Sequence, residues 1–344
     1  MEKIVYLFRR LFYALFVLLG VITIVFLISH LVPGDPTLAL VGPSAPRDII
    51  EGMRTKFGLD RPLLAQYLYY LKNLVLEQDL GFSIQNQRPV AEDIWRYFPA
   101  TFELVTVAMF FAVLIAIPLG VLSAVKKDRW EDHLSRLIAL SGISMPVFWL
   151  GLLLQLLFAY YLGWTPLHGR VLLDVVARHP VTPVTGFMTL DALLKGNWIV
   201  FFDSIKHFIL PGITLSYPSI ALIARMTRSS MLEVMNLDYI RAAIALGIPR
   251  WRVIFKHALP NAIIPTLTII GMAYSYLLGG TVLVETIFDW PGLGLYAVNG
   301  IFALDYPAIV GVTLIFGFFR VIINLLVDFC YFFLDPRITL ESGV

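Results

Sequence analysis

Six long, nearly uncharged apolar runs decide what this chain can fold into. A transmembrane helix needs about 20 consecutive apolar residues. A soluble domain carries roughly 25% charged residues, whereas this chain of 344 residues carries 15% and has a mean hydropathy of +0.80. The runs are 11–31, 104–125, 137–162, 208–224, 262–284 and 306–333. We therefore expect an all-α polytopic membrane protein with six transmembrane helices, the fourth short and broken by Pro211 and Pro218.

The distribution of Lys and Arg predicts the orientation of these runs. Basic residues precede the first run, join the second to the third, and fill the loop before the fifth, whereas the loop 285–305 has none. Positive charge collects in short cytoplasmic loops. We expect a multi-pass protein of the inner (cytoplasmic) cell membrane with both termini in the cytosol.

Two segments then lie outside the membrane. The first, residues 33–99, has apolar residues at helical spacing between Leu63 and Leu74, then Gly81, then a second helical stretch over 90–97. This pattern is typical of a small helical cap on the outer face, or of an isolated membrane-surface segment. The second, 163–206, carries Trp198, Phe201 and Phe202, which suggests partial burial in the interface.

Residues 231–260 form the long charged segment in the second half of the chain. Asp238 suits a helix start, and the residues at helical spacing that would share one face are Tyr239, Ala242, Ala243 and Leu246. Gly247 suits a left-handed helix end, after which Pro249 opens a second short helix. Helix, turn and helix predict either a docking element or an ordinary solvated basic hairpin.

No pattern points to an enzyme. The sequence has no G-x-x-x-x-G-K-[ST], H-E-x-x-H or G-x-S-x-G. Its six His are scattered, and Cys330 is the one cysteine, which excludes an intramolecular disulfide and a cysteine-based metal site. We expect no catalytic residue, no metal and no cofactor held by this chain.

Prolines and polar residues inside the runs indicate an internal path. The five prolines are Pro118, Pro146, Pro211, Pro218 and Pro265. Lipid does not tolerate freed backbone carbonyls, whereas protein interior or a water-filled cavity does. With nearby hydroxyls they favour a bundle with a path, and Ser144, Pro146 and Ser216 are its candidates. Structural kinks without a role in transport are the alternative.

Arg320 lies near the middle of the sixth run, and Asn324 and Asp328 follow at helical spacing. A central Arg costs about 2.5 to 3.5 kcal/mol on insertion scales, so it should face a partner or a cavity. Arg320 and Asn324 either line the path and attract a carboxylate, or Arg320 is paired structurally with a carboxylate. Buried charges are usually paired, which favours the structural pair.

Several motifs resemble one family. The segments are LVPGDP (31–36), GLDRPLLAQY, SGISMPVFWLG (141–151), DYIRAA with HALPNAIIP, ETIFDWPGLG (285–294) and LDPRI (334–338). In this order they resemble ABC importer permeases of the dipeptide/oligopeptide/nickel family, closest to the dipeptide permease B-type subunit. The resemblance implies a single permease domain over 1–344 with the type I ABC importer permease fold.

The resemblance also assigns roles. It makes the charged hairpin the loop that couples to the ATPase, through Asp238, Tyr239, Arg241, Ala242, Ala243 and Gly247. This chain has Ile244 and Leu246 where relatives often have basic residues, which suggests a more apolar contact. The outer gate would involve Glu285, Trp290, Pro291 and Gly292; a simple interfacial turn anchored by the Trp is the alternative.

The implied partners are a second permease in a heterodimer, two cytosolic ATPases that hold ATP and Mg, and an external substrate-binding protein; no nucleic acid is expected. Short peptides are the expected substrate, and oligosaccharides, glutathione or nickel complexes stay open. A different class, an ion-coupled secondary transporter, would predict inverted repeats and midplane carboxylates. The sequence has no clear repeat, and Glu103 and Asp328 lie toward the ends of their runs.

Overall fold

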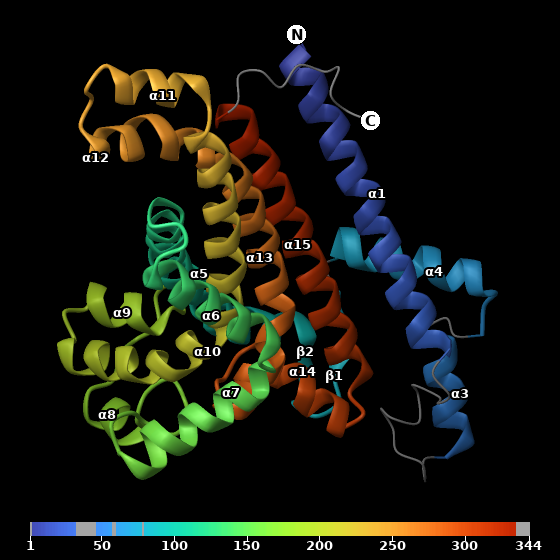
Figure 1. Cartoon of the computed structure of the whole chain (residues 1–344). Helices are drawn as coiled ribbons and strands as arrows, with labels where there is room; N and C mark the ends of the chain where they lie inside the picture. Colours follow the sequence, from blue (N-terminus) through green and yellow to red (C-terminus); the bar gives the residue numbers. More distant parts are fainter. Residues whose placement is uncertain (1, 32–45, 57–59, 78, 335–344) are drawn as a thin grey trace. The chain divides into compact units, whose positions relative to one another are not determined.

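The computed structural model describes residues 2–31, 46–56, 60–77 and 79–334, and most of them are helical (Figure 1). Apart from the first two residues, the chain divides into two compact units. One unit is Lys3–Thr101 with Pro291–Val321, and the other is Phe102–Trp290 with Ile322–Val344. Most of the LVPGDP and LDPRI motifs and the start of the expected cap fall outside the described residues.

The first unit holds the first helices and a small hairpin of strands. Its elements are α1 (Glu2–Leu31), α3 (Arg47–Lys56), α4 (Leu63–Lys72), the π-helical η1 (Asn73–Glu77), β1 (Phe82–Ser83), β2 (Arg88–Pro89), the start of α5 (Val90–Val125), α14 (Leu293–Phe302) and the first part of α15 (Tyr306–Leu334). The two strands pair antiparallel, Phe82 opposite Pro89. The helices predicted between 63 and 74 and from 90 are present; the strands are not foreseen by the sequence pattern.

The α4 helix packs against α1. Thr23 and Tyr67 share a hydrogen bond of 2.7 Å, and the ring of Phe26 lies 5.2 Å from that of Tyr67 and 5.6 Å from that of Tyr70. Burial raises the pKa of Tyr70 to about 12. These contacts contradict an isolated surface segment; whether the helices cap the outer face stays a prediction.

A buried carboxylate anchors the strand hairpin of the first unit. Asp305 is fully buried, and its Oδ2 accepts hydrogen bonds from Ser83 Oγ (2.5 Å) and the Gln85 N–H (3.1 Å). The surrounding core consists of Val90, Ile94, Leu293, Tyr296, Ala308 and Val312. Helices α5, α14 and α15 thus close over the turn between the strands.

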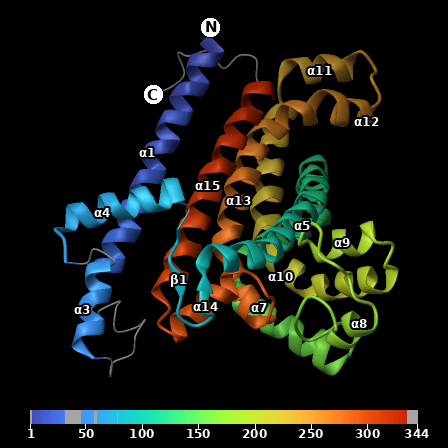
Figure 2. The same ribbon diagram turned by 180° about the vertical axis from the view of Figure 1, so that it is seen from behind.

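The second unit contains the remaining helices. Besides the end of α5 they are α6 (Trp130–Ser144), α7 (Val147–Leu154), the π-helical η2 (Gln155–Tyr161), α8 (Leu173–Arg178), α9 (Met188–Leu194), α10 (Trp198–Met235), α11 (Asp238–Ala245), α12 (Arg250–Arg252), the π-helical η3 (Val253–Ala258), α13 (Leu259–Ile287) and the end of α15. The long helices α10 and α13 pack side by side (Figures 1 and 2).

Five helices of the described chain are long and apolar enough to cross a membrane: Arg9–Leu27, Val90–Val125, Trp198–Met235, Arg250–Ile287 and Tyr306–Val327. The third predicted run forms two helical pieces, α6 and α7 with η2, bent by 107° at the break. Six spans result when this bent pair counts as one. Pro146 lies at the break, where it precedes α7.

The fourth span is neither short nor broken, which corrects the prediction from its prolines. Helix α10 continues for 38 residues through Pro211 and Pro218. A proline removes one backbone hydrogen bond and crowds a carbonyl, but neighbouring helices hold such a helix together. Helix α10 packs on α6, α7, α9 and α13, and 72% of its most apolar stretch is buried.

Two glycines allow close approach of helices in the second unit. A Cβ on Gly271 of α13 would lie 2.0 Å from a methyl carbon of Val327 in α15. A Cβ on Gly120 of α5 would lie 2.7 Å from the Ala224 carbonyl oxygen in α10. A larger residue at either position requires the helices to separate.

Candidate coupling and gating sites

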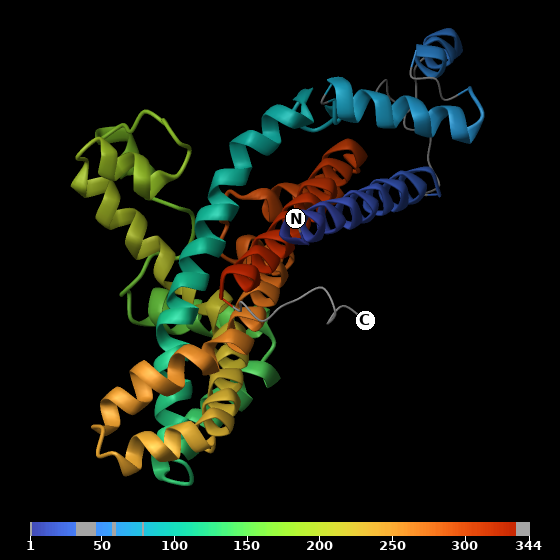
Figure 3. The same ribbon diagram turned by 90° about the horizontal axis from the view of Figure 1, so that it is seen from above.

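The charged hairpin has the predicted helix–turn–helix form, at one end of α10 and α13 (Figures 2 and 3). Helix α11 ends at Ala245, and Gly247 has φ +75°, a left-handed conformation that side chains rarely adopt. Nothing lies within 4 Å of a Cβ built at Gly247, so φ and not space restricts this position. Pro249 then precedes α12. The predicted roles of both residues in the turn are confirmed.

One face of α11 is fixed to the rest of the second unit. Ile240 is fully buried and Ala243 is nearly so. Their apolar cluster also contains Val121, Ala124, Met231, Val253, Ala258 and Ala262. The prediction that Ala243 shares a face with Tyr239, Ala242 and Leu246 is therefore wrong, because Ala243 packs into the chain's own core. A helix held through such a cluster moves with α5, α10 and α13.

The opposite face of α11 is exposed. Tyr239, Ala242 and Leu246 lie there, and Leu246 is 80% exposed. The Tyr239 hydroxyl accepts a hydrogen bond from Asn261 Nδ2 (2.9 Å), which ties it to α13. Asp238 and Arg241 form an exposed ion pair of 3.4 Å, worth little in water. The hairpin thus presents an apolar surface with charged groups beside it.

A buried carboxylate, missed from the sequence, joins α6 to α10 beside this hairpin. Asp132 is fully buried, and its Oδ1 accepts from Arg228 Nε (2.8 Å) while its Oδ2 accepts from Arg228 Nη2 (2.9 Å). Arg136 Nη2 (2.5 Å), Ser123 Oγ (2.5 Å) and the Asp128 N–H (3.0 Å) also donate to it. Bidentate hydrogen bonds from an arginine to a carboxylate are strong and directional.

We call this group the Asp132 node: Asp132 with Ser123, Arg136, Arg228 and the Asp128 N–H. It ties the ends of α5, α6 and α10 together near the hairpin cluster. Arg136 follows Asp132 by four residues, a spacing that the sequence shows. The contact with Arg228, 96 residues away, is visible only in the fold.

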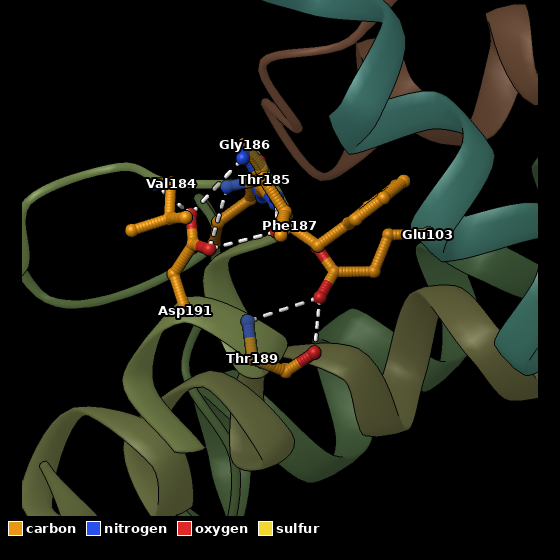
Figure 4. A network of polar contacts seen from close by, with 8 residues as sticks. Glu103, Val184, Thr185, Gly186, Phe187, Thr189 and Asp191 are labelled. Carbon is orange, nitrogen blue, oxygen red and sulfur yellow. Dashed lines mark hydrogen bonds and ion pairs between the residues drawn. The ribbon is translucent and has the colours of Figure 1, made fainter. Parts of the chain in front are cut away.

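A second network, also missed, organises the segment 163–206 (Figure 4). Glu103 of α5 is buried, and it accepts hydrogen bonds from the Thr189 N–H (3.0 Å) and the Thr189 hydroxyl, and pairs with Arg170. The glutamate therefore holds both α9 and the chain before α8. Glu103 therefore belongs to a structural ion pair with Arg170 and is not an isolated intramembrane carboxylate.

Asp191 fixes the turn before α9 on the other side of the same view. Its carboxylate accepts from the Val184 N–H (3.1 Å), the Gly186 N–H (3.0 Å), and the Thr185 N–H (2.8 Å) and hydroxyl (2.7 Å) (Figure 4). Burial alone would raise the pKa of Asp191, but these hydrogen bonds outweigh it and lower the pKa below its ordinary value. The segment is thus held by two anchored carboxylates.

The predicted gate residue Trp290 is buried and packed inside the second unit. Its ring meets Phe208 edge-on at 4.6 Å, and the Arg170 guanidinium lies 5.7 Å from its centre. Full burial contradicts an interfacial Trp anchor, because such an anchor places its ring at the membrane surface. Arg170 therefore contacts both Trp290 and Glu103.

The other gate candidates flank Trp290. Glu285 is fully buried in α13, where the sequence pattern places it at the end of a span. Pro291 and Gly292 belong to the first unit; Pro291 is exposed, and Gly292 is buried and precedes α14. Asp289 has φ +45°, a left-handed conformation that Asp adopts more readily than most residues.

The path candidates do not gather at one point of the second unit. Ser144 and Pro146 are exposed at the break between α6 and α7. Ser216 is buried, and its hydroxyl donates to the Ile213 carbonyl (3.1 Å). Asn324 accepts a hydrogen bond from Ser275 (3.2 Å). Their roles in a path stay predictions.

Arg320 is exposed in the first unit. Among the side chains that the structure describes, no carboxylate lies within ion-pair distance of it. The predicted structural partner is a carboxylate on a neighbouring span or Asp328 through Asn324, and the side chain of Asp328 lies outside that set. The described residues also contain no group of three or more His, Cys, Asp and Glu that could hold a metal.

Comparison with known proteins identifies the family. Residues 116–340 match the family described as binding-protein-dependent transport system inner membrane component, and residues 3–105 match the N-terminal region of such membrane components. The chain is 48% identical over 329 residues to the probable D,D-dipeptide transport system permease protein DdpB of Escherichia coli (strain K12), with 95% of each chain covered.

Two further relatives span nearly the whole chain. The dipeptide transport system permease protein DppB of Alkalihalophilus pseudofirmus is 45% identical over 333 residues, with 97% of this chain and 98% of the relative covered. The glutathione transport system permease protein GsiC of Escherichia coli O6:H1 is 38% identical over 333 residues, with the same coverage. The helical fold, the hairpin and these matches place the chain in the family of inner-membrane components of binding-protein-dependent transport systems, the permeases of ABC importers.

Proposed function

We propose that this permease passes short peptides, delivered by an external substrate-binding protein, across the inner membrane. The observation that carries the proposal is the identity of 48% and 45% over nearly the whole chain to permeases named for D,D-dipeptide and dipeptide transport. The relative named for glutathione, itself a small peptide, is 38% identical. Substrate choice rests mainly with the external protein, so the path needs only weak contacts.

The complex that fits this role has four further chains. They are a second homologous permease, two cytosolic ATPases and the external binding protein. ATP and Mg bind to the ATPases, and this chain supplies no cofactor site. The basic hairpin and both termini face the cytosol, as the distribution of Lys and Arg favours.

The hairpin would couple the ATPases to the membrane helices. Ile240 and Ala243 fix it to α5, α10 and α13, so movement of the hairpin moves those helices. The exposed face offers Tyr239, Ala242 and Leu246 to the ATPase, with Asp238, Arg241 and Ile244 beside it. Differential contacts of the ATPases in their two states then shift the permease between inward- and outward-facing forms.

The gate and the path are assigned by the same proposal. Glu285, Trp290, Pro291 and Gly292 belong to the outer gate, where Arg170 supports the tryptophan. Ser144, Pro146, Ser216, Arg320 and Asn324 contribute to the path. Arg320 is exposed, so it is available to a carboxylate of the peptide, and a structural pair with a carboxylate is the alternative.

The test compares two substitutions at the hairpin turn. Gly247→Val forces a β-branched residue into a left-handed conformation, at a cost of roughly 1–2 kcal/mol. Gly247→Asn is the matched control, because Asn adopts this conformation far more readily. The complex is reconstituted, and ATP hydrolysis is measured with and without binding protein loaded with a dipeptide pool.

Stimulation by loaded binding protein that persists in Gly247→Asn and is lost in Gly247→Val supports the importer and the hairpin. Stimulation by glutathione, sugars or nickel chelates alone would change the substrate assigned to the permease and leave the proposed architecture unchanged. A rate of ATP hydrolysis that depends neither on the binding protein nor on the Gly247→Val substitution refutes the coupling role.

A further inference from the structure

A cavity of about 260 Å³ opens between α5, α6 and α10, beside the Asp132 node. Its walls are mostly apolar, formed by residues such as Leu119, Ala139, Leu140, Ile143 and Ala224. A dry apolar cavity of about 150 Å³ already accepts benzene. The space therefore suits a hydrocarbon segment better than water.

The polar side of the cavity carries an excess of positive charge. Arg136, Arg225 and Arg228 line it, whereas the carboxylates that face them are Asp132 and Asp128. Arg225 is exposed, and no described side chain forms an ion pair with it. Three guanidinium groups against two carboxylates leave one positive charge, which an anion would balance.

Exposed apolar side chains border the cavity. Leu140 is 62% exposed and Ile143 is 47% exposed, on a helix of the bent span. Arg225 and Arg228 lie in the last third of α10, and Arg136 lies in the middle of α6. Long Arg side chains extend toward the membrane interface, where phospholipid phosphates lie. Basic pockets between membrane helices bind anionic lipid headgroups.

We propose that this cavity binds one anionic phospholipid, with its phosphate at Arg225 and Arg136 and an acyl chain along Leu140 and Ile143. The lipid would lie against the Asp132 node, so its charge bears directly on the contact between α6 and α10. The proposal depends neither on the peptide substrate nor on the coupling role of the hairpin.

The test measures lipid binding to the intact complex by native mass spectrometry. Phosphatidylglycerol and zwitterionic phosphatidylcholine are titrated separately. Arg225→Gln removes the unpaired charge, and Ala139→Trp fills the apolar part. Arg250→Gln is the matched control, since Arg250 is an exposed arginine of the hairpin. We expect tighter binding of phosphatidylglycerol, weakened roughly fivefold by Arg225→Gln, the share of one arginine near anionic lipid.

A photoreactive residue at position 140 identifies the occupant. An adduct with the mass of phosphatidylglycerol, absent in Ala139→Trp, supports the proposal. Equal binding of the two lipids, or equal effects of Arg225→Gln and Arg250→Gln, overturns it. So does an adduct with the second permease, because the cavity is then a protein interface.

Discussion

Replacement of Asp132 by Asn should weaken the junction of α6 and α10 more than any nearby surface change. The carboxylate accepts five hydrogen bonds: two through Oδ1, from Ser123 and Arg228 Nε, and three through Oδ2, from Asp128 N, Arg136 and Arg228 Nη2. An amide nitrogen cannot accept, so at least two bonds are lost together with the negative charge.

The magnitude follows from burial. Removing one partner of a buried ion pair costs about 3–5 kcal/mol. The side chains of Arg136 and Arg228 are 43% and 22% exposed, so water partly compensates them. We therefore expect Asp132→Asn to lower the free energy of unfolding by about 3 kcal/mol, the low end of that range.

The assay is unfolding of the purified permease in mixed micelles by a denaturing detergent, combined with a double-mutant cycle. Asp132→Asn, Arg228→Gln and the double variant give the coupling energy of the pair, expected near 2 kcal/mol. Asp128→Asn is the control, because that carboxylate is 70% exposed and lies 3.3 Å from Arg136; it should cost less than 1 kcal/mol.

Two results would refute this reasoning. One is an Asp132→Asn protein as stable as the Asp128→Asn control. The other is strict additivity of Asp132→Asn and Arg228→Gln, because independent effects would mean that the pair contributes no joint stabilisation.

Three further predictions concern the second unit. Gly271→Ala should destabilise by about 1–3 kcal/mol because its Cβ would lie 2.0 Å from Val327, whereas Gly279→Ala, with nothing within 4 Å, should stabilise the same helix by about 0.5–1 kcal/mol; detergent unfolding compares them. Trp290→Ala should cost about 3–5 kcal/mol in that assay, and no loss would contradict the observed burial. The lowered pKa of Asp191 adds stability that is fully present above its ordinary pKa of 3.8 and is lost as the pH falls through the lowered value. Hydrogen exchange of residues 184–191, compared with the intrinsic amide rate at each pH, should therefore accelerate only below pH 3.8. The Asp191→Asn substitution should abolish this pH dependence.

The hairpin shows which local features a sequence can predict. Gly247 and Pro249 impose backbone conformations that few other residues favour, so the helix end and the new helix follow from the two residues themselves. The side of α11 that is buried does not follow, because Ala243 and Leu246 are both apolar. Only contact with the ends of α5, α10 and α13 decides that Ala243 is covered and Leu246 is not.

The sequence by itself determined that the chain crosses a membrane, since each apolar run has the length and composition of a span without reference to its neighbours. The tertiary structure alone decided the rest: that α10 continues through Pro211 and Pro218, that Trp290 is buried, and that Asp132 meets Arg228. Each of these depends on packing between segments far apart in the chain. The local sequence pattern carries no information on which distant segments come into contact.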